Sequence, residues 1–528
     1  MNEDQFISIY FNDHDANVSF FRPSDNKLLI LELERIWGQR YFNFATFSKI
    51  EKPFIYKRIK DISLDFGFHP EFKHCIFPTH FPMENDFYSG IESEFKIKEY
   101  HKYFHHECHA ANVFYDSGFD KSLIVSFDGG GDEGCFVVFE ANKETGFKKI
   151  NNEDFLDFPN YYGIAAILIK EIKKSSDFNI TKLASAGKIM GLSAYGNFNQ
   201  TLYDRCFNFL NTKVQPAYDS IYQSLKILND KIEYNCLDGQ KAYDLAYNLQ
   251  LAFENIVLKK IKPYLDSGKY QNICLSGGGA LNVLLNDRLS ENYPKINFYV
   301  SNSPNDSGLS YGGLCSHFKK KIVDDPMYSG CQILDKEILQ HILNYRRWRY
   351  ADPILIAKEI YEGKIIGLCQ GNSEVGPRAL GNRTILANPC LHNIKDDINK
   401  KVKFREWFRP FAPICIKEES NKYFNITNNV NYDYMSFSPK VKENYRKTLP
   451  AITHIDGSSR LQTINKNQNS YLYEILKQFE KLSGFPILVN TSFNVKGKSI
   501  LTHYQAALQN LDTTQLDGII LDGYYITK

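Results

Sequence analysis

The chain has 528 residues, of which 43% are hydrophobic and 23% are charged. This composition is typical of a globular protein and excludes disordered, collagen-like and repeat-array chains. Lys and Arg number 63 against 61 Asp and Glu, which leaves a net charge of +2. Because positive and negative charges nearly balance, the protein has no overall electric field that would favour a nucleic acid or a membrane. Any such partner would have to bind a local patch.

The cysteines and the N-terminal residues predict a cytoplasmic protein. The eleven cysteines include no C-x-x-C pair, which argues against a disulfide framework and a structural zinc site. The start MNEDQFISIYF has no basic region, and the longest uncharged apolar stretch, near 161–169, is far shorter than the roughly 20 residues of a membrane span. We therefore expect reduced, mostly buried thiols, and neither secretion nor membrane insertion.

Two hairpins with polar tips are predicted in the N-terminal half. Segment 6–21 predicts two strands around the turn Asn12-Asp13-His14-Asp15, and residues 28–33 add a third strand. Segment 121–140 repeats the pattern around a glycine-rich turn at 128–134. Helices are expected over 101–114 and 243–264.

A glycine loop between a strand and a helix is typical of phosphate binding. Residues 272–275 predict a buried strand, 276–279 form the loop SGGG, and a helix is expected over 280–289. Free amides at a helix N-terminus favour an anion, and glycines 129–131 of the second hairpin offer similar amides. A tight crossover is the alternative for the first loop, and a plain hairpin turn for the second.

Two histidines four residues apart predict a metal site. His105 and His109 project from one face of the expected helix, where both imidazoles can meet one ion. Asp128 ends a predicted buried strand, and Asp306 lies beside a glycine in Asn-Asp-Ser-Gly. Two imidazoles and two carboxylates suit iron or manganese better than structural zinc. The alternative is a half-buried helix face that carries histidines without a metal.

A second region is predicted from residue 350, where a helix and a strand follow the charged stretch 319–326, and we place the domain boundary near residue 340. Basic side chains gather in this region, and they could surround a small dianion because guanidinium groups grip phosphate or carboxylate in a bidentate manner. They are Arg378, Arg383, Lys403, Arg405 and Arg409. The alternative is a solvated face paired with Glu374 and Glu406. Ser492, after the predicted strand FPILV, offers a hydroxyl.

In their order along the chain, these motifs resemble the ATP-dependent O-carbamoyltransferases of the nodulation-factor and antibiotic-tailoring type. The resemblance covers nearly the whole chain. It rests on His105-x-x-x-His109, VSFDGGGDEG, GKIMGL, LSGGGALN, NDSG, EVGPRALGNR, KFREWFRPFAP, THIDGSSRLQT and FPILVNTSFN.

The resemblance implies an α/β protein of two domains. Residues 1–340 would form a duplicated ATPase-like domain of the actin, sugar kinase and heat-shock chaperone class, and 341–528 a YrdC-like α/β domain. The second domain would form carbamoyl adenylate from carbamoyl phosphate and ATP, with Mg²⁺ accompanying ATP. The first would then transfer the carbamoyl group to an acceptor hydroxyl and release AMP. A homodimer is the family expectation.

The resemblance also implies roles for residues at matching positions. The iron ligands would be His105, His109, Asp128 and Asp306. Nucleotide contacts would come from Gly129, Gly130, Lys188, Gly277, Gly278 and Asn282. Carbamoyl phosphate would be held by Arg378, Arg383, Lys403, Arg405 and Ser492. His14 and Asp15 are the candidates for activating the acceptor hydroxyl.

Two departures from the family pattern stand out. Relatives commonly carry Gly-Arg ahead of the acidic residue in the GPRALG motif, whereas this chain has Gly371-Asn372-Ser373-Glu374, so one anion-binding cation is missing or supplied elsewhere. The chain is also somewhat shorter than usual, which puts acceptor-binding insertions in doubt.

Two other functions fit the motifs less well than carbamoyl transfer. A chaperone-like nucleotide switch would not explain the C-terminal arginines or the histidine pair. Threonylcarbamoylation of tRNA is disfavoured because both domains lie on one chain with this set of motifs. The default acceptor is a hydroxyl of a sugar or natural product. The alternative is a hydroxymethylated base in DNA, for which the basic and aromatic stretches 345–350 and 317–321 would supply contacts.

Overall fold

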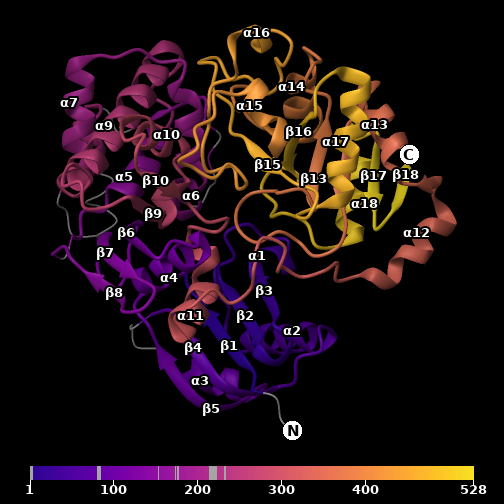
Figure 1. Cartoon of the computed structure of the whole chain (residues 1–528), viewed down its shortest axis with the longest axis horizontal. Helices are drawn as coiled ribbons and strands as arrows, with labels where there is room; N and C mark the ends of the chain where they lie inside the picture. Colours follow the sequence, from indigo (N-terminus) through magenta and orange to yellow (C-terminus); the bar gives the residue numbers. More distant parts are fainter. Residues whose placement is uncertain are drawn as a thin grey trace.

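The computed structural model describes residues 4–79, 85–152, 154–172, 174, 178–212, 223–230 and 233–528. It confirms the α/β class, because helices and strands alternate along the chain and the strands form three sheets. In Figure 1 the first sheet occupies the lower lobe near the N-terminus, the second the upper left lobe, and the third the upper right lobe near the C-terminus.

The first two sheets share one topology, in the orders β3-β2-β1-β4-β5 and β8-β7-β6-β9-β10. In each, the first strand pairs antiparallel with the next strand and parallel with a later one. The first sheet comprises β1 (Phe6–Tyr10), β2 (Asn17–Arg22), β3 (Lys27–Glu32), β4 (Glu71–Phe77) and β5 (Lys96–Lys102). The second comprises β6 (Lys121–Phe127), β7 (Phe136–Asn142), β8 (Gly146–Lys149), β9 (Asn272–Ser276) and β10 (Asn297–Tyr299). Both predicted hairpins and the duplicated arrangement are confirmed.

Two central helices join these halves. Helix α4 (His105–Ser117) follows β5 and packs on β6 and β9 of the second sheet. Helix α11 (Leu309–Phe318) follows β10 and packs on β1, β2 and β4 of the first sheet. The two helices also pack on each other, so each half of the duplication lends a helix to the other half.

The N-terminal half contains further helices. They are α1 (Leu33–Ile36), α2 (Lys52–Asp65), α3 (Asn85–Glu92), α5 (Phe158–Ile164), α6 (Phe178–Ser193), α7 (Gln200–Leu210), α9 (Gly239–Asp266) and α10 (Val283–Asn292). Helices α6 and α7 pack on α9, whose apolar residues fill the core of the upper left lobe in Figure 1. The long helix expected over 243–264 is thus confirmed.

The third sheet has eight strands in the order β11-β18-β17-β12-β13-β16-β14-β15. Its strands are β11 (Trp348–Tyr350), β12 (Ile366–Cys369), β13 (Arg383–Ala387), β14 (Ala412–Ile416), β15 (Gln462–Ile464), β16 (Ile487–Ser492), β17 (Gly518–Leu521) and β18 (Tyr524–Thr527). Its helices are α12 (Leu339–Tyr345), α13 (Pro353–Tyr361), α14 (Ile394–Asp397), α15 (Ser420–Tyr423), α16 (Glu443–Arg446), α17 (Ser470–Ser483) and α18 (Tyr504–Thr513). The domain boundary at 340 falls in α12 and stays a prediction, as does the YrdC-like class of this part.

Two expected helix starts were wrong. His101 belongs to β5, and the helix begins only at His105, because backbone pairing of β5 with β4 extends the strand to Lys102. The helix expected from residue 280 begins at Val283, since a 3₁₀ turn over Gly278–Leu281 intervenes and Asn282 caps α10 by accepting from the Leu285 amide.

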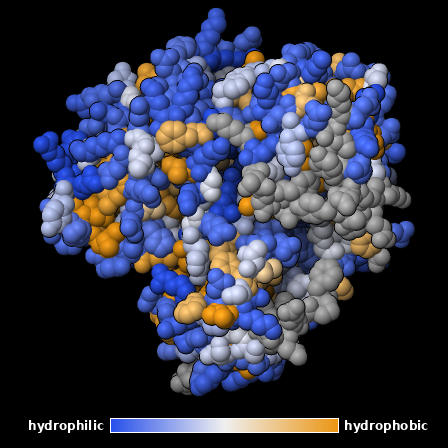
Figure 2. All heavy atoms as spheres, turned by 180° about the vertical axis from the view of Figure 1, so that it is seen from behind, coloured by the Kyte–Doolittle hydropathy of each residue, from blue (hydrophilic) through white to orange (hydrophobic). Residues whose placement is uncertain are grey.

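All eleven cysteines are free thiols, and most are buried, as expected. None of the described helices combines the length and apolarity needed to cross a membrane. The face seen from behind in Figure 2 is mostly hydrophilic, with its hydrophobic residues in several separate groups.

Candidate metal and anion sites

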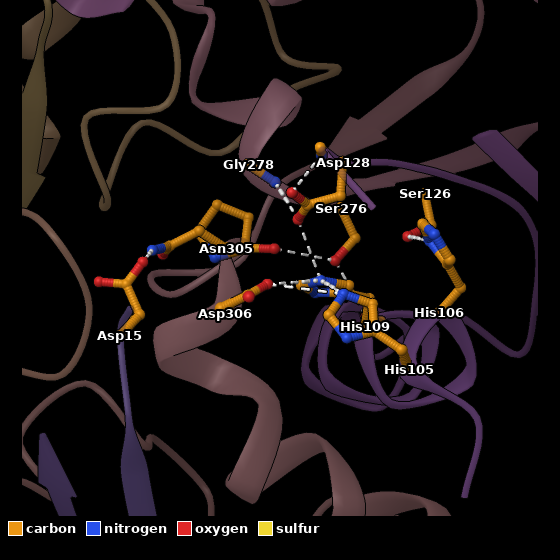
Figure 3. A network of polar contacts seen from close by, with 12 residues as sticks. Asp15, His105, His106, His109, Ser126, Asp128, Ser276, Gly278, Asn305 and Asp306 are labelled. Carbon is orange, nitrogen blue, oxygen red and sulfur yellow. Dashed lines mark hydrogen bonds and ion pairs between the residues drawn. The ribbon is translucent and has the colours of Figure 1, made fainter. Parts of the chain in front are cut away.

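The four predicted metal ligands converge between the duplicated halves. His105 and His109 lie one turn apart on α4, Asp128 follows β6, and Asp306 opens the turn into α11. His109 Nε2 lies 3.2 Å from Asp128 Oδ2 and 3.3 Å from Asp306 Oδ1. His105 Nε2 lies 3.1 Å from His109 Nε2 and 3.6 Å from Asp306 Oδ1. One ligand atom of each residue lies within 4.8 Å of the others, and Figure 3 shows all four side chains pointing toward one centre.

Both carboxylates are held by hydrogen bonds from outside the cluster. Asp128 accepts from the Gly129 amide at 2.6 Å and from the Gly278 amide at 2.7 Å. Asp306 Oδ2 accepts from the Tyr10 hydroxyl at 2.7 Å. Because these donors occupy other lone pairs, each carboxylate keeps capacity for a cation at the centre.

The electrostatics of the cluster also fit a cation. Burial opposes protonation of His109, but hydrogen bonds with Asp128 and Asp306 outweigh it and raise its pKa to about 9. Burial lowers the pKa of His105, although Asp306 opposes this. Without a metal, a proton on His109 therefore supplies the positive charge between the two carboxylates. Two imidazoles and two carboxylates around one centre fit a divalent iron or manganese ion.

His106 does not belong to the cluster. Its Nδ1 lies 2.7 Å from Ser126 Oγ and its Nε2 lies 2.9 Å from the Gly134 carbonyl oxygen. Figure 3 shows its ring turned toward Ser126, away from His109. Both ring nitrogens are thus engaged in joining α4 to the second hairpin.

The first hairpin reaches the same site from the other half. His14 Nδ1 lies 3.1 Å from Asp15 Oδ2, which also accepts from Asn305 at 3.1 Å. Asn17 donates to the carbonyl oxygens of Asp15 and Asp306, so it ties the hairpin tip to the metal-ligand turn. Burial opposes protonation of His14, but Asp15 outweighs it and raises the pKa to about 9. His14 is therefore a cation near neutral pH.

The glycine loop of the second half contacts Asp128 through the Gly278 amide. Gly277 has φ +85°, and a Cβ there would lie 2.3 Å from the Phe127 carbonyl oxygen, so this position requires glycine. Asn282 is buried and exchanges hydrogen bonds of 2.9 and 3.0 Å with Gln250. A Cβ at Gly130 would meet nothing within 4 Å, which leaves that side of the second loop open.

Basic side chains from all three lobes converge in a second place, which we name the cation cluster. Its members are Arg40, Lys188, Arg378, Lys403, Arg405, Arg409 and Arg460. Burial lowers the pKa of Arg378 to about 10, and the charges of Arg409 and Arg40 add to the shift. The pKa of Lys403 is lowered by burial and then by Arg405 and Arg409. Like charges this close, with few carboxylates among them, are typical of an anion site.

The predicted carbamoyl phosphate residues divide into two groups. Lys403 Nζ donates to Ser492 O at 2.6 Å and lies 3.2 Å from Ser492 Oγ, so these two residues are brought together. Arg383 is fully buried and donates to the carbonyl oxygens of Gln370 and Gly371 at 2.5 and 2.7 Å. Its guanidinium therefore holds the loop that carries Gly371, and contact with a substrate stays a prediction for Arg383.

Sequence reasoning missed several residues of these sites. Tyr10 and Asn17 support Asp306, and nothing in their strand pattern distinguishes them from packing residues. Besides burial, the charge of Arg40 lowers the pKa values of Arg378 and Arg409, and the charges of these two arginines lower the pKa of Arg460. Arg460 could have been predicted, since it lies in the motif THIDGSSRLQT. Arg40 lies in none of the motifs and belongs to the lobe of the first sheet.

Comparison with known proteins now identifies the family. Family models described as carbamoyltransferase N-terminus and carbamoyltransferase C-terminus match residues 54–315 and 357–528. An uncharacterised protein of Methanocaldococcus jannaschii is 31% identical, over 83% of this chain and 85% of its own length. The chain belongs to the carbamoyltransferase family.

Other relatives of this carbamoyltransferase-family chain are nodulation proteins. NolO of Bradyrhizobium diazoefficiens is 29% identical, over 80% of this chain and 78% of its own length. NolNO of Sinorhizobium fredii is 30% identical over 80% of this chain, but the match spans only 63% of NolNO, less than two thirds of that relative. A crystal structure of full-length HypF in its phosphate- and nucleotide-bound form shares 13% identity, covers 60% of this chain and 55% of HypF, and superposes with a TM-score of 0.36.

The basic and aromatic stretch 345–350 lies away from the metal cluster. Tyr345 and Tyr350 are 76% and 71% exposed. In Figure 1, α12 and the edge of the third sheet that β11 and β18 form lie at the outer side of the C-terminal lobe, far from α4 and α11. In the other stretch, Lys321 is paired with Asp116 at 3.2 Å. A nucleic-acid partner stays a prediction, and the stretch 345–350 would have to bind it at a distance from the cluster.

Proposed function

We propose that this chain makes carbamoyl adenylate from carbamoyl phosphate and ATP and transfers the carbamoyl group to a hydroxyl of an acceptor. The observation that carries the proposal is the presence of two built sites in a carbamoyltransferase-family chain. One is the cluster of His105, His109, Asp128 and Asp306 between the duplicated halves. The other is the cation cluster, to which Lys188 of the upper left lobe and Arg409 of the C-terminal lobe both belong.

The first step belongs to the cation cluster, whose charges suit phosphate groups. Water first hydrolyses carbamoyl phosphate to carbamate and inorganic phosphate. A carbamate oxygen then attacks the α-phosphorus of ATP, and pyrophosphate departs. Phosphate and pyrophosphate are therefore expected in equal amounts. Lys403, already bonded to Ser492, would hold the reacting phosphate, while Arg405 and Arg409 neutralise the charge that develops on it.

The second step belongs to the metal cluster. His105, His109, Asp128 and Asp306 would hold a divalent iron or manganese ion, which when bound polarises the phosphate of the adenylate and makes AMP a better leaving group. The amides of Gly129 and Gly278 and the hydroxyl of Tyr10 keep the carboxylates in place. This support costs no reorganisation during the reaction, because the donors are part of the folded backbone and core.

We assign proton removal from the acceptor to the pair His14 and Asp15. Because the pKa of His14 is raised to about 9, its ring carries a proton at neutral pH and cannot accept another. Asp15 is the member of the pair that can take the hydroxyl proton, and His14 orients it at 3.1 Å. Asp15 has φ +53°, an uncommon conformation that aims its carboxylate from the hairpin tip toward Asn305.

The acceptor we favour is a hydroxyl of a sugar or natural product. The metal cluster is mostly buried between the duplicated halves, and His14 and Asp15 are half-buried beside it, so a small acceptor would reach them without a large contact surface. The hydroxymethylated base of DNA remains the alternative acceptor. It gains no support from the position of the stretch 345–350.

The experiment that tests the proposal follows both half-reactions by mass spectrometry. Anaerobic protein with iron(II), ATP and carbamoyl phosphate should yield carbamoyl adenylate with equal phosphate and pyrophosphate. A panel of aminoglycosides, sugars, nucleosides and hydroxymethylcytosine-containing DNA should then reveal a product with one carbamoyl mass added. Failure to form either pyrophosphate or a carbamoylated product would refute the proposal, and a chaperone-like switch would retain magnesium with nucleotide but no iron.

A further inference from the structure

A second group of histidines lies outside the sites described above. His74 belongs to β4, His101 to β5 and His317 to the last turn of α11. One ring nitrogen of each lies within 4.8 Å of those of the other two. The ring centroid of His101 lies 4.8 Å from that of His74 and 4.8 Å from that of His317. The ring centroids of His74 and His317 are 5.1 Å apart. We name this group the three-histidine cluster.

The sheet register brings these residues to one face. Strands β4 and β5 are parallel, with His74 opposite Glu99 and Ile76 opposite His101. Because side chains alternate along a strand, His101 lies on the same face as Glu99, beside His74. Helix α11 packs on β4 and delivers His317 to that face. The side chains of His74 and His101 are 13% and 31% exposed, so an ion can enter from solvent.

The surroundings favour a cation. Glu99 Oε2 lies 3.2 Å from His74 Nδ1 and 3.7 Å from His101 Nε2, so it offers a carboxylate oxygen to the cluster. The Tyr103 hydroxyl lies 3.1 Å from His317 Nδ1, and this contact orients the ring. The C-terminal end of α11 also places the negative end of a helix dipole beside His317.

Burial favours the neutral, metal-binding form of two of the three rings. Burial lowers the pKa of His317 to about 4, and His101 and His74 add to this shift. Burial and His101 likewise lower the pKa of His74. Neutral imidazoles have a free lone pair for a metal at pH 7, whereas protonated ones do not.

We propose that His74, His101 and His317, together with Glu99, bind a divalent transition ion, zinc by preference. Three imidazole nitrogens and one carboxylate oxygen match the tetrahedral ligand sets of zinc. His74 Nδ1 and His101 Nε2 lie 2.7 Å apart, and two ligands of a tetrahedral zinc ion lie about 3.3 Å apart. A separation of the rings by roughly half an ångström therefore admits the ion.

The position of this site gives it a structural role. His101 precedes His105 by four residues, and His317 stands at the other end of α11 from the turn that holds Asp306. An ion held by the three-histidine cluster would clamp β4 and β5 to α11. It would thereby fix the two segments that lead into the first metal cluster, without touching the reacting groups. The inference is independent of the proposed function.

Metal titration of the metal-free protein tests the inference. Cobalt(II) followed by visible absorption and zinc followed by calorimetry should report two sites in the unmodified protein. His109→Ala should retain one site with the intense absorption of four-coordinate cobalt, and His109→Ala with His317→Ala should retain none. Because even outer-shell changes reduce metal affinity 10- to 100-fold, loss of His317 should weaken this site by more than about 100-fold.

Controls separate binding from folding. His69→Ala removes an exposed histidine near β4 and should leave both sites intact. His101→Ala removes the more exposed strand histidine and should also abolish the second site, with the circular dichroism spectrum unchanged. Zinc should raise the Tm of His109→Ala but not that of the double variant. Unchanged stoichiometry and affinity in both His101→Ala and His317→Ala would overturn the inference and leave the rings as a packing cluster against Phe6.

Discussion

Lys188 of α6 and Glu406 of the C-terminal lobe form a buried ion pair, with Nζ 3.3 Å from Oε1 and side chains that are 10% and 2% exposed. Arg409 lies on the other side of Glu406, 3.7 Å away. Gly191, one turn after Lys188, also faces Phe408 and Pro410. The pair therefore joins the duplicated part of the chain to the loop that carries much of the cation cluster.

Loss of this ion pair should destabilise the protein. Lys188→Met removes one charged partner of a buried carboxylate, and breaking such a pair costs about 3 kcal/mol or more. Urea denaturation at pH 7 measures the change in the free energy of unfolding. The matched control is Lys170→Met, whose pair with Asp238 is 63% and 66% exposed and should be worth less than about 1 kcal/mol. Equal effects of the two changes would contradict the structural role of Lys188.

Gly277→Ala should be far more harmful than Gly130→Ala. A side chain at Gly277 would be strained at φ +85° and would meet the Phe127 carbonyl oxygen at 2.3 Å, at a cost of roughly 3 kcal/mol. At Gly130 a Cβ meets nothing within 4 Å, so Ala should change stability by less than about 1 kcal/mol. Thermal denaturation of the two variants makes the comparison. A Gly277→Ala protein as stable as the parent would show that the loop adopts another conformation.

His109→Ala should separate the two half-reactions. The variant should bind no iron at the first cluster and lose carbamoyl transfer, yet still release pyrophosphate, because the cation cluster lies elsewhere in the fold. His106→Gln is the control, since both ring nitrogens of His106 are engaged with Ser126 and Gly134 and neither is a ligand atom of the cluster. It should reduce stability by about 1–3 kcal/mol and keep its iron. Bound iron and pyrophosphate are measured in parallel, and iron lost from both variants alike would disprove the ligand assignment.

The contact between Asp287 and Ser438 should make stability depend on pH. Burial raises the pKa of Asp287 to about 7, against hydrogen bonds from Ser438 that lower it. A carboxyl group with a higher pKa in the folded state binds its proton more tightly there, so its contribution to stability falls as pH rises from about 4 to about 7. Asp287→Asn cannot ionise and removes this contribution.

The difference in the free energy of unfolding between the parent and Asp287→Asn should therefore change between pH 5 and pH 8. The variant should gain stability relative to the parent as pH rises toward 7 and level off above it, with urea denaturation as the measurement. Glu443→Gln, at the N-terminus of α16, serves as the control for a carboxylate outside this contact. A constant difference across this range would show that Asp287 is ionised throughout.

A small acceptor should make the transfer step insensitive to salt. Binding of DNA weakens by about 10³-fold or more between roughly 50 and 200 mM salt when many phosphates are contacted. A sugar hydroxyl has no such charge, so the KM of the acceptor should change by less than about twofold. Steady-state kinetics at both salt concentrations decide the question. A steep rise in KM, abolished by Arg346→Ala and Trp348→Ala, would favour the DNA acceptor.

The local features of this protein follow from its sequence alone. Alternating apolar residues around polar turns predict both hairpins, and the spacing of His105 and His109 places their rings on one face of α4 whatever the rest of the fold. The order of the motifs along the chain indicates the carbamoyltransferase family, which the family models confirm. These inferences succeed because the spacing of side chains along a helix or strand, and the residue preferences of turns, depend on only a few neighbouring residues.

Only the tertiary structure decided which distant residues meet. Helix α4 crosses to the second sheet and α11 to the first, and this exchange brings Asp306 to His109 and Tyr10 to Asp306. Arg40, between α1 and α2, meets Arg378 of the C-terminal lobe, and His317 of α11 meets His74 and His101. The physical reason is that such meetings depend on strand register and helix packing between segments far apart in the chain, for which no local pattern codes.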